Sequence, residues 1–132
     1  MTVIGNAGMI VRFEIPVNPQ PKKRVRRGRG GVWYTPPETV AYEQEVALHA
    51  QLQMVKHNLS IIETPLMLSC DFYREGNRGV DLDNLIKALK DAFNGVVWTD
   101  DKQVIEYGQM RLYRGCKKET GYSIVTIGES TI

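Results

Sequence analysis

The sequence predicts an α+β fold in which a mixed β-sheet carries two main helices, in the order β-α-β-α-β-β. Four segments alternate apolar and polar residues with the period of a strand that has one solvated face, and two segments between them repeat apolar residues at helical spacing. Because helices bury their apolar stripes against the apolar face of a sheet, this order favours helices packed on one sheet face. The 132 residues contain no internal repeat and no second core pattern, so we expect residues 1–132 to form a single domain.

The first strand is expected at residues 9–16, where apolar residues alternate with Arg12 and Glu14. Residues 1–8 show no periodicity, and the sequence assigns them no role. Residues 18–31 contain prolines and glycines that exclude a helix or a central strand, so they are expected to form a flexible basic loop.

The first helix is expected to begin at Thr35, whose hydroxyl can cap it, with Pro36 in the first turn and Glu38 completing a capping box. It is expected to end near Lys56, because Asn58 is a suitable stop. The stripe at helical spacing that should face the core is Val40, Glu43, Ala47, Leu48, Gln51, Leu52 and Val55.

The second half of the chain predicts a strand, a short helix and two further strands. The strand is expected at residues 66–74, and the amphipathic helix runs from Leu82 to a stop at Gly95. The final strands are expected at residues 104–112 and 122–127, separated by a basic turn.

Composition excludes several protein classes. No stretch approaches the roughly 18 apolar residues of a membrane helix, and the N-terminus lacks a secretory signal, so we expect a soluble cytoplasmic protein with no membrane partner. Cys70 and Cys116 lie far apart without a CxxC spacing. A zinc site built on thiolates is therefore not expected, and both cysteines are predicted to be reduced.

Positive charge is concentrated in the loop at residues 18–31. The chain has 17 Lys and Arg against 15 Asp and Glu, a net charge of +2; without the six basic residues of the loop, 11 against 15 leaves −4. These six are Lys22, Lys23, Arg24, Arg26, Arg27 and Arg29. Such a concentration predicts contact with nucleic-acid phosphates, although a solvated flexible run has the same composition. Trp33 and Tyr34, which follow, could stack on unpaired bases or anchor the loop to the core.

Oxygen ligands flank the second helix on both sides. The segments DLDN and TDDKQV hold the hard donors that Mg²⁺ or Mn²⁺ prefers, namely Asp81, Asp83, Asn84, Asp100 and Asp101. Each pair alone could be structural, because Asp commonly caps a helix or forms a turn. Two pairs beside one short helix favour a metal site, since converging carboxylates repel one another unless a cation neutralises them.

The chemistry that such a site predicts is metal-assisted attack of water on a phosphodiester. Lys87, one turn further along the helix, could offset negative charge in the transition state or could be an ordinary solvated lysine. Asp91 is expected to be an ion-pair partner on the helix face rather than a ligand.

These motifs resemble the RusA family of Holliday-junction resolvases, which occurs in bacteria and in their phages and prophages. The resemblance rests on DLDN, a Lys three residues after the Asn, the helix, and a Trp followed by DD and QV. It extends from MIVRFEIP through the basic loop and TPPETVAYEQEV to the last strands. It implies a homodimer that resolves four-way DNA junctions in recombination and repair, with Mg²⁺ at two active sites that nick opposing strands symmetrically.

The resemblance also implies roles for individual residues. Asp81, Asp83 and Asp101 correspond to the Mg²⁺ ligands, with Asp100 a further candidate, and Lys87 corresponds to a catalytic or DNA-contacting lysine. Some members carry Arg directly before DLDN. Here Val80 occupies that position, and Arg78 is the candidate substitute for DNA contact.

Two other functions stay open at this point. The first is a non-catalytic module that binds branched DNA through the basic loop, with the acidic residues acting as helix caps. The second is a metal-dependent nuclease that uses the same acids on flaps or other branched DNA.

Overall fold

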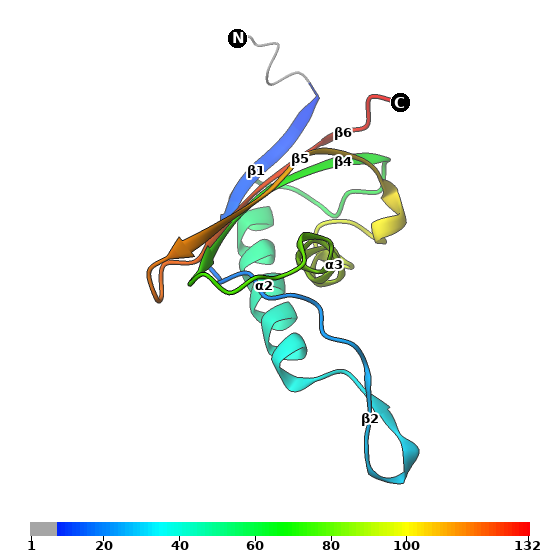
Figure 1. Ribbon diagram of the computed structural model, residues 1–132. Helices are drawn as coiled ribbons and strands as arrows, with labels where there is room; N and C mark the ends of the chain where they lie inside the picture. Colours follow the sequence, from blue (N-terminus) through cyan, green and yellow to red (C-terminus); the bar gives the residue numbers. More distant parts are fainter. Residues whose placement is uncertain (1–7) are drawn as a thin grey trace.

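The computed structural model describes residues 8–132, and its main body is a mixed sheet of four strands (Figure 1). The strands are β1 (Met9–Ile15), β4 (Leu66–Glu75), β5 (Val104–Cys116) and β6 (Tyr122–Glu129), in the spatial order β1-β6-β4-β5. β4 and β5 are parallel, and the other neighbours are antiparallel. The α+β class, the mixed sheet and the order of main elements are confirmed. Apart from Gly8, the leader at residues 1–8 lies outside the described residues.

The two main helices, α2 (Pro37–Lys56) and α3 (Leu82–Phe93), lie on the same face of the sheet (Figure 1). α3 forms the crossover that the parallel pair β4 and β5 requires. Its last residue, Phe93, packs in the core, with its ring 5.8 Å from that of Phe13 and 5.3 Å from that of Trp98. No helix in residues 8–132 is long and apolar enough to cross a membrane.

The N-terminus of α2 differs from the prediction that Thr35 caps it. The N-cap residue is Pro36, and no side chain caps the helix. Two consecutive prolines explain the difference, because neither has a backbone N–H that needs a partner at the helix start. Thr39, inside the first turn, is the residue whose hydroxyl is used, since it accepts a hydrogen bond from the backbone N–H of Lys23 at 3.2 Å. The helix ends at Lys56, as predicted.

The face of α2 that packs on the sheet is not the predicted stripe. The buried residues are Thr39, Tyr42, Val46, Ala50 and Met54. Leu48 and Leu52, which the prediction placed in the core, are each 56% exposed, and Val55 is 73% exposed. The helix carries apolar residues on two faces, and periodicity alone does not say which face meets the sheet. The small Ala50 and the amphipathic Thr39 and Tyr42 form the side that fits.

The basic segment, which was expected to be a loop, includes a short hairpin. β2 (Arg26–Arg27) pairs with β3 (Trp33–Tyr34), and the turn η1 (Arg29–Gly31) joins them. Gly30 and Gly31 have φ angles of +78° and +80°, which reverse the chain. Strands of two residues leave no periodic signal in the sequence. We call residues 24–34 the basic arm; it projects from the body beyond the N-terminus of α2 (Figure 1).

Candidate active site

The N-terminus of α3 carries the first acidic pair. Asp81 is the N-cap residue, and its Oδ1 accepts a hydrogen bond from the backbone N–H of Asp83 at 2.9 Å. This bond satisfies an amide that the helix leaves unpaired, and the partial positive charge at a helix N-terminus favours carboxylates there. Asp83 lies in the first turn with an exposed side chain.

The second acidic pair repeats this arrangement at a short 3₁₀ turn, η2 (Asp101–Gln103). Asp100 is the N-cap, and its Oδ1 accepts a hydrogen bond from the backbone N–H of Lys102 at 2.9 Å. Gln103 completes a capping box, because its Oε1 accepts from the backbone N–H of Asp100 at 3.0 Å. Asp101 lies in the turn and is half-buried.

Two anchors hold η2 beside α3. The Trp98 indole is fully buried, and its Nε1–H donates to Asn94 Oδ1 at 2.8 Å, which fixes the segment that leaves α3. Gln103 Nε2 donates to the backbone carbonyls of Ile62 and Thr64, at 2.8 and 3.1 Å. Gln103 therefore connects the turn that carries Asp101 to the segment before β4.

Asp83 and Asp101 line the same pocket, although they are 18 positions apart in the sequence. The pocket has a volume of about 260 Å³, and its other lining residues are Ile86, Lys87, Lys90 and Tyr107. Neither carboxylate accepts a hydrogen bond or pairs with a cation from residues 8–132. Two carboxylates without protein partners thus face the same space as two lysines.

The two acidic pairs converge less completely than expected. No three His, Cys, Asp or Glu side chains in residues 8–132 lie close enough to hold one metal ion. Asp81 lines a different pocket, and Asp100 caps η2, so the first Asp of each pair has a structural role. Mg²⁺ is commonly held by one or two carboxylates, with waters and substrate phosphates as the other ligands. Asp83 and Asp101 fit that requirement.

A second pocket, next to Asp81, contains the arginines of this region. It has a volume of about 340 Å³, and besides Asp81 its polar lining includes Lys23, Arg74, Arg78 and Asn84. Arg74 Nε donates to the backbone carbonyl of Pro19 at 2.9 Å, and burial lowers the pKa of its guanidinium. Arg78 is exposed, whereas Val80 is half-buried. Positive charge therefore surrounds the position that precedes DLDN even though Val80 supplies none.

Lys22 differs from the other basic residues of the segment because its side chain forms two ion pairs with the body of the protein. Its Nζ lies 2.8 Å from Glu43 Oε2 and 3.1 Å from Asp91 Oδ2, and its side chain is 20% exposed. Burial opposes the charged form, but the hydrogen bonds to Glu43 and Asp91 outweigh it and raise the pKa of Lys22. Asp91 thus forms an ion pair, as predicted, but with Lys22 of the basic segment and not with a residue of its own helix. Lys22 links that segment to both helices, and its ammonium is paired with two carboxylates.

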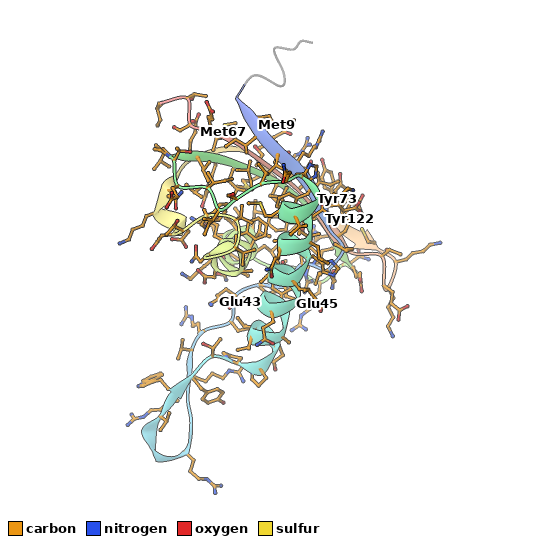
Figure 2. The ribbon with its side chains drawn as sticks, turned by 180° about the vertical axis from the view of Figure 1, so that it is seen from behind. Met9, Glu43, Glu45, Met67, Tyr73 and Tyr122 are labelled. Carbon is orange, nitrogen blue, oxygen red and sulfur yellow. The ribbon has the colours of Figure 1, made fainter. Side chains whose placement is uncertain are left out.

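The other basic residues lie on or near the arm. Lys23 Nζ lies 3.8 Å from Glu38 Oε2, and its backbone N–H is the donor to Thr39. The remaining four, Arg24, Arg26, Arg27 and Arg29, are exposed. Figure 2 shows the side chains of the arm pointing away from it on both sides, clear of the body of the protein.

Comparison with known protein families assigns the chain to a family. The family described as endodeoxyribonuclease RusA matches residues 14–121, which is most of the chain. The chain belongs to the RusA family. Membership implies endonuclease activity on Holliday junctions and therefore binding to branched DNA. A separate comparison with curated proteins found no match.

Three residues of this RusA site were missed by sequence reasoning. Lys90 follows Asp83 and Lys87 at positions i+7 and i+3, so helical spacing could have placed it on the same face. Tyr107 comes from β5 and gave no sequence signal; Lys90 Nζ donates to its hydroxyl at 2.8 Å. Gln103 was visible only as part of the QV motif, and its hydrogen bonds to two distant carbonyls depend on the fold.

Proposed function

We propose that this protein is a Mg²⁺-dependent endonuclease that resolves four-way DNA junctions. The observation that supports this proposal best is the pocket shared by Asp83 and Asp101, whose carboxylates have no partner in the described part of the chain and face Lys87 and Lys90. Carboxylates placed this way are suited to a hard divalent cation, Mg²⁺ or Mn²⁺. RusA family membership supplies the nucleic-acid substrate.

In this proposal the residues in and beside the pocket have different roles in metal binding and catalysis. Asp83 and Asp101 hold the cation, and the remaining Asp81 oxygen orders a water or phosphate at the edge of the site. The chemistry that Mg²⁺ held there would supply is activation of a water and polarisation of the phosphodiester. Lys87 stabilises the negative charge that develops on the phosphate oxygens. Lys90 is held by Tyr107 and adds to the positive potential of the pocket.

DNA binding in this proposal uses the basic arm and the pocket beside Asp81. Arg24, Arg26, Arg27 and Arg29 contact phosphates of the duplex arms, with Lys23 at the root. Arg78, at the rim of the Asp81 pocket, contacts a phosphate close to the scissile bond. Lys22 holds the arm and makes no DNA contact.

We further propose that the protein works as a homodimer, because symmetric nicking of a junction needs two active sites. The outward face of α2 supports this, since Leu48, Leu52 and Val55 recur at positions i, i+4 and i+7 and are all exposed. Leu52→Lys is expected to yield a monomer in size-exclusion chromatography with light scattering. Ser60→Lys, at an exposed position outside α2, is the matched control. A dimer in both variants would show that α2 is not the interface.

Substrate competition tests the proposed function and separates it from the two other functions. Wild-type protein is incubated with Mg²⁺ and with a mobile four-way junction, a flap and a linear duplex of equal length. Asp83→Asn is the inactive variant, and Glu14→Gln, at an exposed position of β1, is the control. Paired symmetric nicks on the junction alone support the proposal. Flap cleavage would favour the other nuclease, and binding without cleavage would favour the non-catalytic module.

A further inference from the structure

The basic arm presents an exposed tryptophan between arginines. Trp33 is 64% exposed, and it lies in β3 opposite Arg27 of β2. The Arg27 guanidinium carbon lies 5.9 Å from the centre of the indole ring, a cation–π distance that restricts how the ring is turned. Large aromatic surface on a projecting hairpin contributes nothing to the core, so its exposure calls for a binding role.

The second aromatic residue of the arm has a structural role. The Tyr34 ring lies against Gly28, where an added Cβ would come within 3.2 Å of Tyr34 Cε1. The backbone N–H of Gly28 also donates to the carbonyl of Val32 at 2.7 Å, which closes the hairpin below the turn. Tyr34, which is 44% exposed, therefore packs partly against the hairpin, and Trp33, at 64%, is the more exposed of its two aromatic side chains.

The root of the arm is tied to the helix that carries Asp83. The backbone N–H of Lys22 donates to the carbonyl of Asn84 at 3.0 Å, and the Lys22 side chain contacts Glu43 and Asp91. Lys23 is bonded to Thr39 at the start of α2. These contacts join the segment just before the arm to two helices, so the root of the arm is held beside the helix that carries Asp83.

We propose that Trp33 stacks on an unpaired or unstacked base at the branch point of the DNA, while the arginines on either side hold the adjoining phosphates. Arg26, Arg27 and Arg29 supply the charge complementarity with the backbone, and the indole face supplies stacking, which does not depend on base identity. Because the root is fixed at Asn84, stacking at the branch point would set the distance from the branch to the phosphate in the Asp83 pocket. This inference rests on the proposed function for its substrate.

Tryptophan fluorescence can test the proposal directly, because the chain has two tryptophans in opposite environments. Trp98 is fully buried, whereas Trp33 is exposed. The wild-type protein is titrated with a four-way junction in EDTA, so that no cleavage occurs, with selective excitation of tryptophan. We expect the junction to quench the Trp33 emission and to protect it from acrylamide. In Trp33→Phe only the Trp98 emission remains, and the junction should leave it unchanged.

The controls compare substrates and neighbouring positions. Trp33→Ala should weaken junction binding about tenfold, within the range reported for loss of one base stack, and leave linear-duplex binding unchanged. Trp33→Phe should keep most of the affinity, and Val32→Ala, at the adjacent exposed position, should keep all of it. Unchanged wild-type emission at a junction concentration that saturates binding by anisotropy would overturn the proposal. Equal quenching by linear duplex would overturn it as well.

The two proposals fail in different ways in these experiments. If the protein cleaves the junction without quenching of Trp33, the proposed function stands and the stacking role of Trp33 is wrong. A protein that shows junction-specific quenching but no Mg²⁺-dependent cleavage keeps the stacking role and loses the nuclease assignment.

Discussion

The carboxylate of Asp81 accepts a hydrogen bond from the backbone N–H of Asp83, 2.9 Å away. Asp100 makes the same contact with Lys102 at η2. In both acidic pairs the first Asp caps the turn, and the second has no hydrogen-bond or ion-pair partner among residues 8–132. If the second Asp of each pair acts in catalysis, substitutions of the first should lower stability and substitutions of the second should lower activity.

The cap contact predicts different effects for two substitutions at Asp81. Asp81→Ala should lower the free energy of unfolding by about 1 kcal/mol, because the backbone amide of Asp83 loses its partner. Asp81→Asn should keep most of that stability, since an amide oxygen also caps a helix. Urea unfolding followed by circular dichroism measures both. Equal stability of the Ala variant and the wild type would contradict the capping role.

Lys22 is predicted to stabilise the protein rather than to contact DNA. Lys22→Met should lower the free energy of unfolding by about 1–3 kcal/mol, between the values for exposed and buried ion pairs, because Glu43 and Asp91 lose their cation. The pKa of Lys22 is raised in the folded protein, so its stabilisation is complete below the ordinary pKa of 10.5 and is lost as the pH rises through the folded value. Stability measured against pH should show this alkaline loss in the wild type and not in Lys22→Met.

The salt dependence of binding tests the arginines of the arm. Arg24→Gln with Arg29→Gln should weaken junction binding and lower the slope of log affinity against log salt by about 1–2, because each phosphate contact contributes about 0.9. Arg114→Gln, exposed in the strand β5 away from the arm, is the matched charge control. An unchanged slope in the double variant would remove the arm from the DNA interface.

Gln103 is predicted to act as a positioning residue for Asp101. Gln103→Glu keeps an acceptor for the backbone N–H of Asp100 but loses the donors to the Ile62 and Thr64 carbonyls. We expect cleavage to slow about tenfold and to need more Mg²⁺, while junction binding in EDTA stays unchanged. A merely structural role would lower stability without moving the Mg²⁺ dependence, and that result would contradict the prediction.

The fold could be predicted well where a residue pattern was compatible with only one secondary structure and one buried face. The alternating strands and the apolar run of α3 gave the sheet and the crossover helix correctly. α2 was harder, because Leu48 and Leu52 form one apolar stripe and Val46 and Ala50 form another. Only the shape of the sheet surface decides between them, and this information is not local in sequence.

The sequence predicted which residues would be in the candidate site, but not which of them would cap a helix or turn and which would face the pocket. The acidic motifs named Asp83 and Asp101, and the structure brings both to one pocket. Which Asp of each pair would be used as a cap depends on where the turn begins, and that shifts by single residues. Lys22 looked like the other basic residues because its partners, Glu43 and Asp91, lie 21 and 69 positions away in the sequence.

The cleavage rate of a four-way junction by Asp83→Asn and Asp101→Asn, measured in single turnover across a range of Mg²⁺ concentrations, tests the central claim most directly. If the two carboxylates hold the catalytic cation, each variant should lose at least about a hundredfold in rate while it still folds and binds the junction. Glu14→Gln, at an exposed position of β1, should cleave at the wild-type rate. A near-wild-type rate in either Asp variant would show that the metal and the chemistry lie elsewhere.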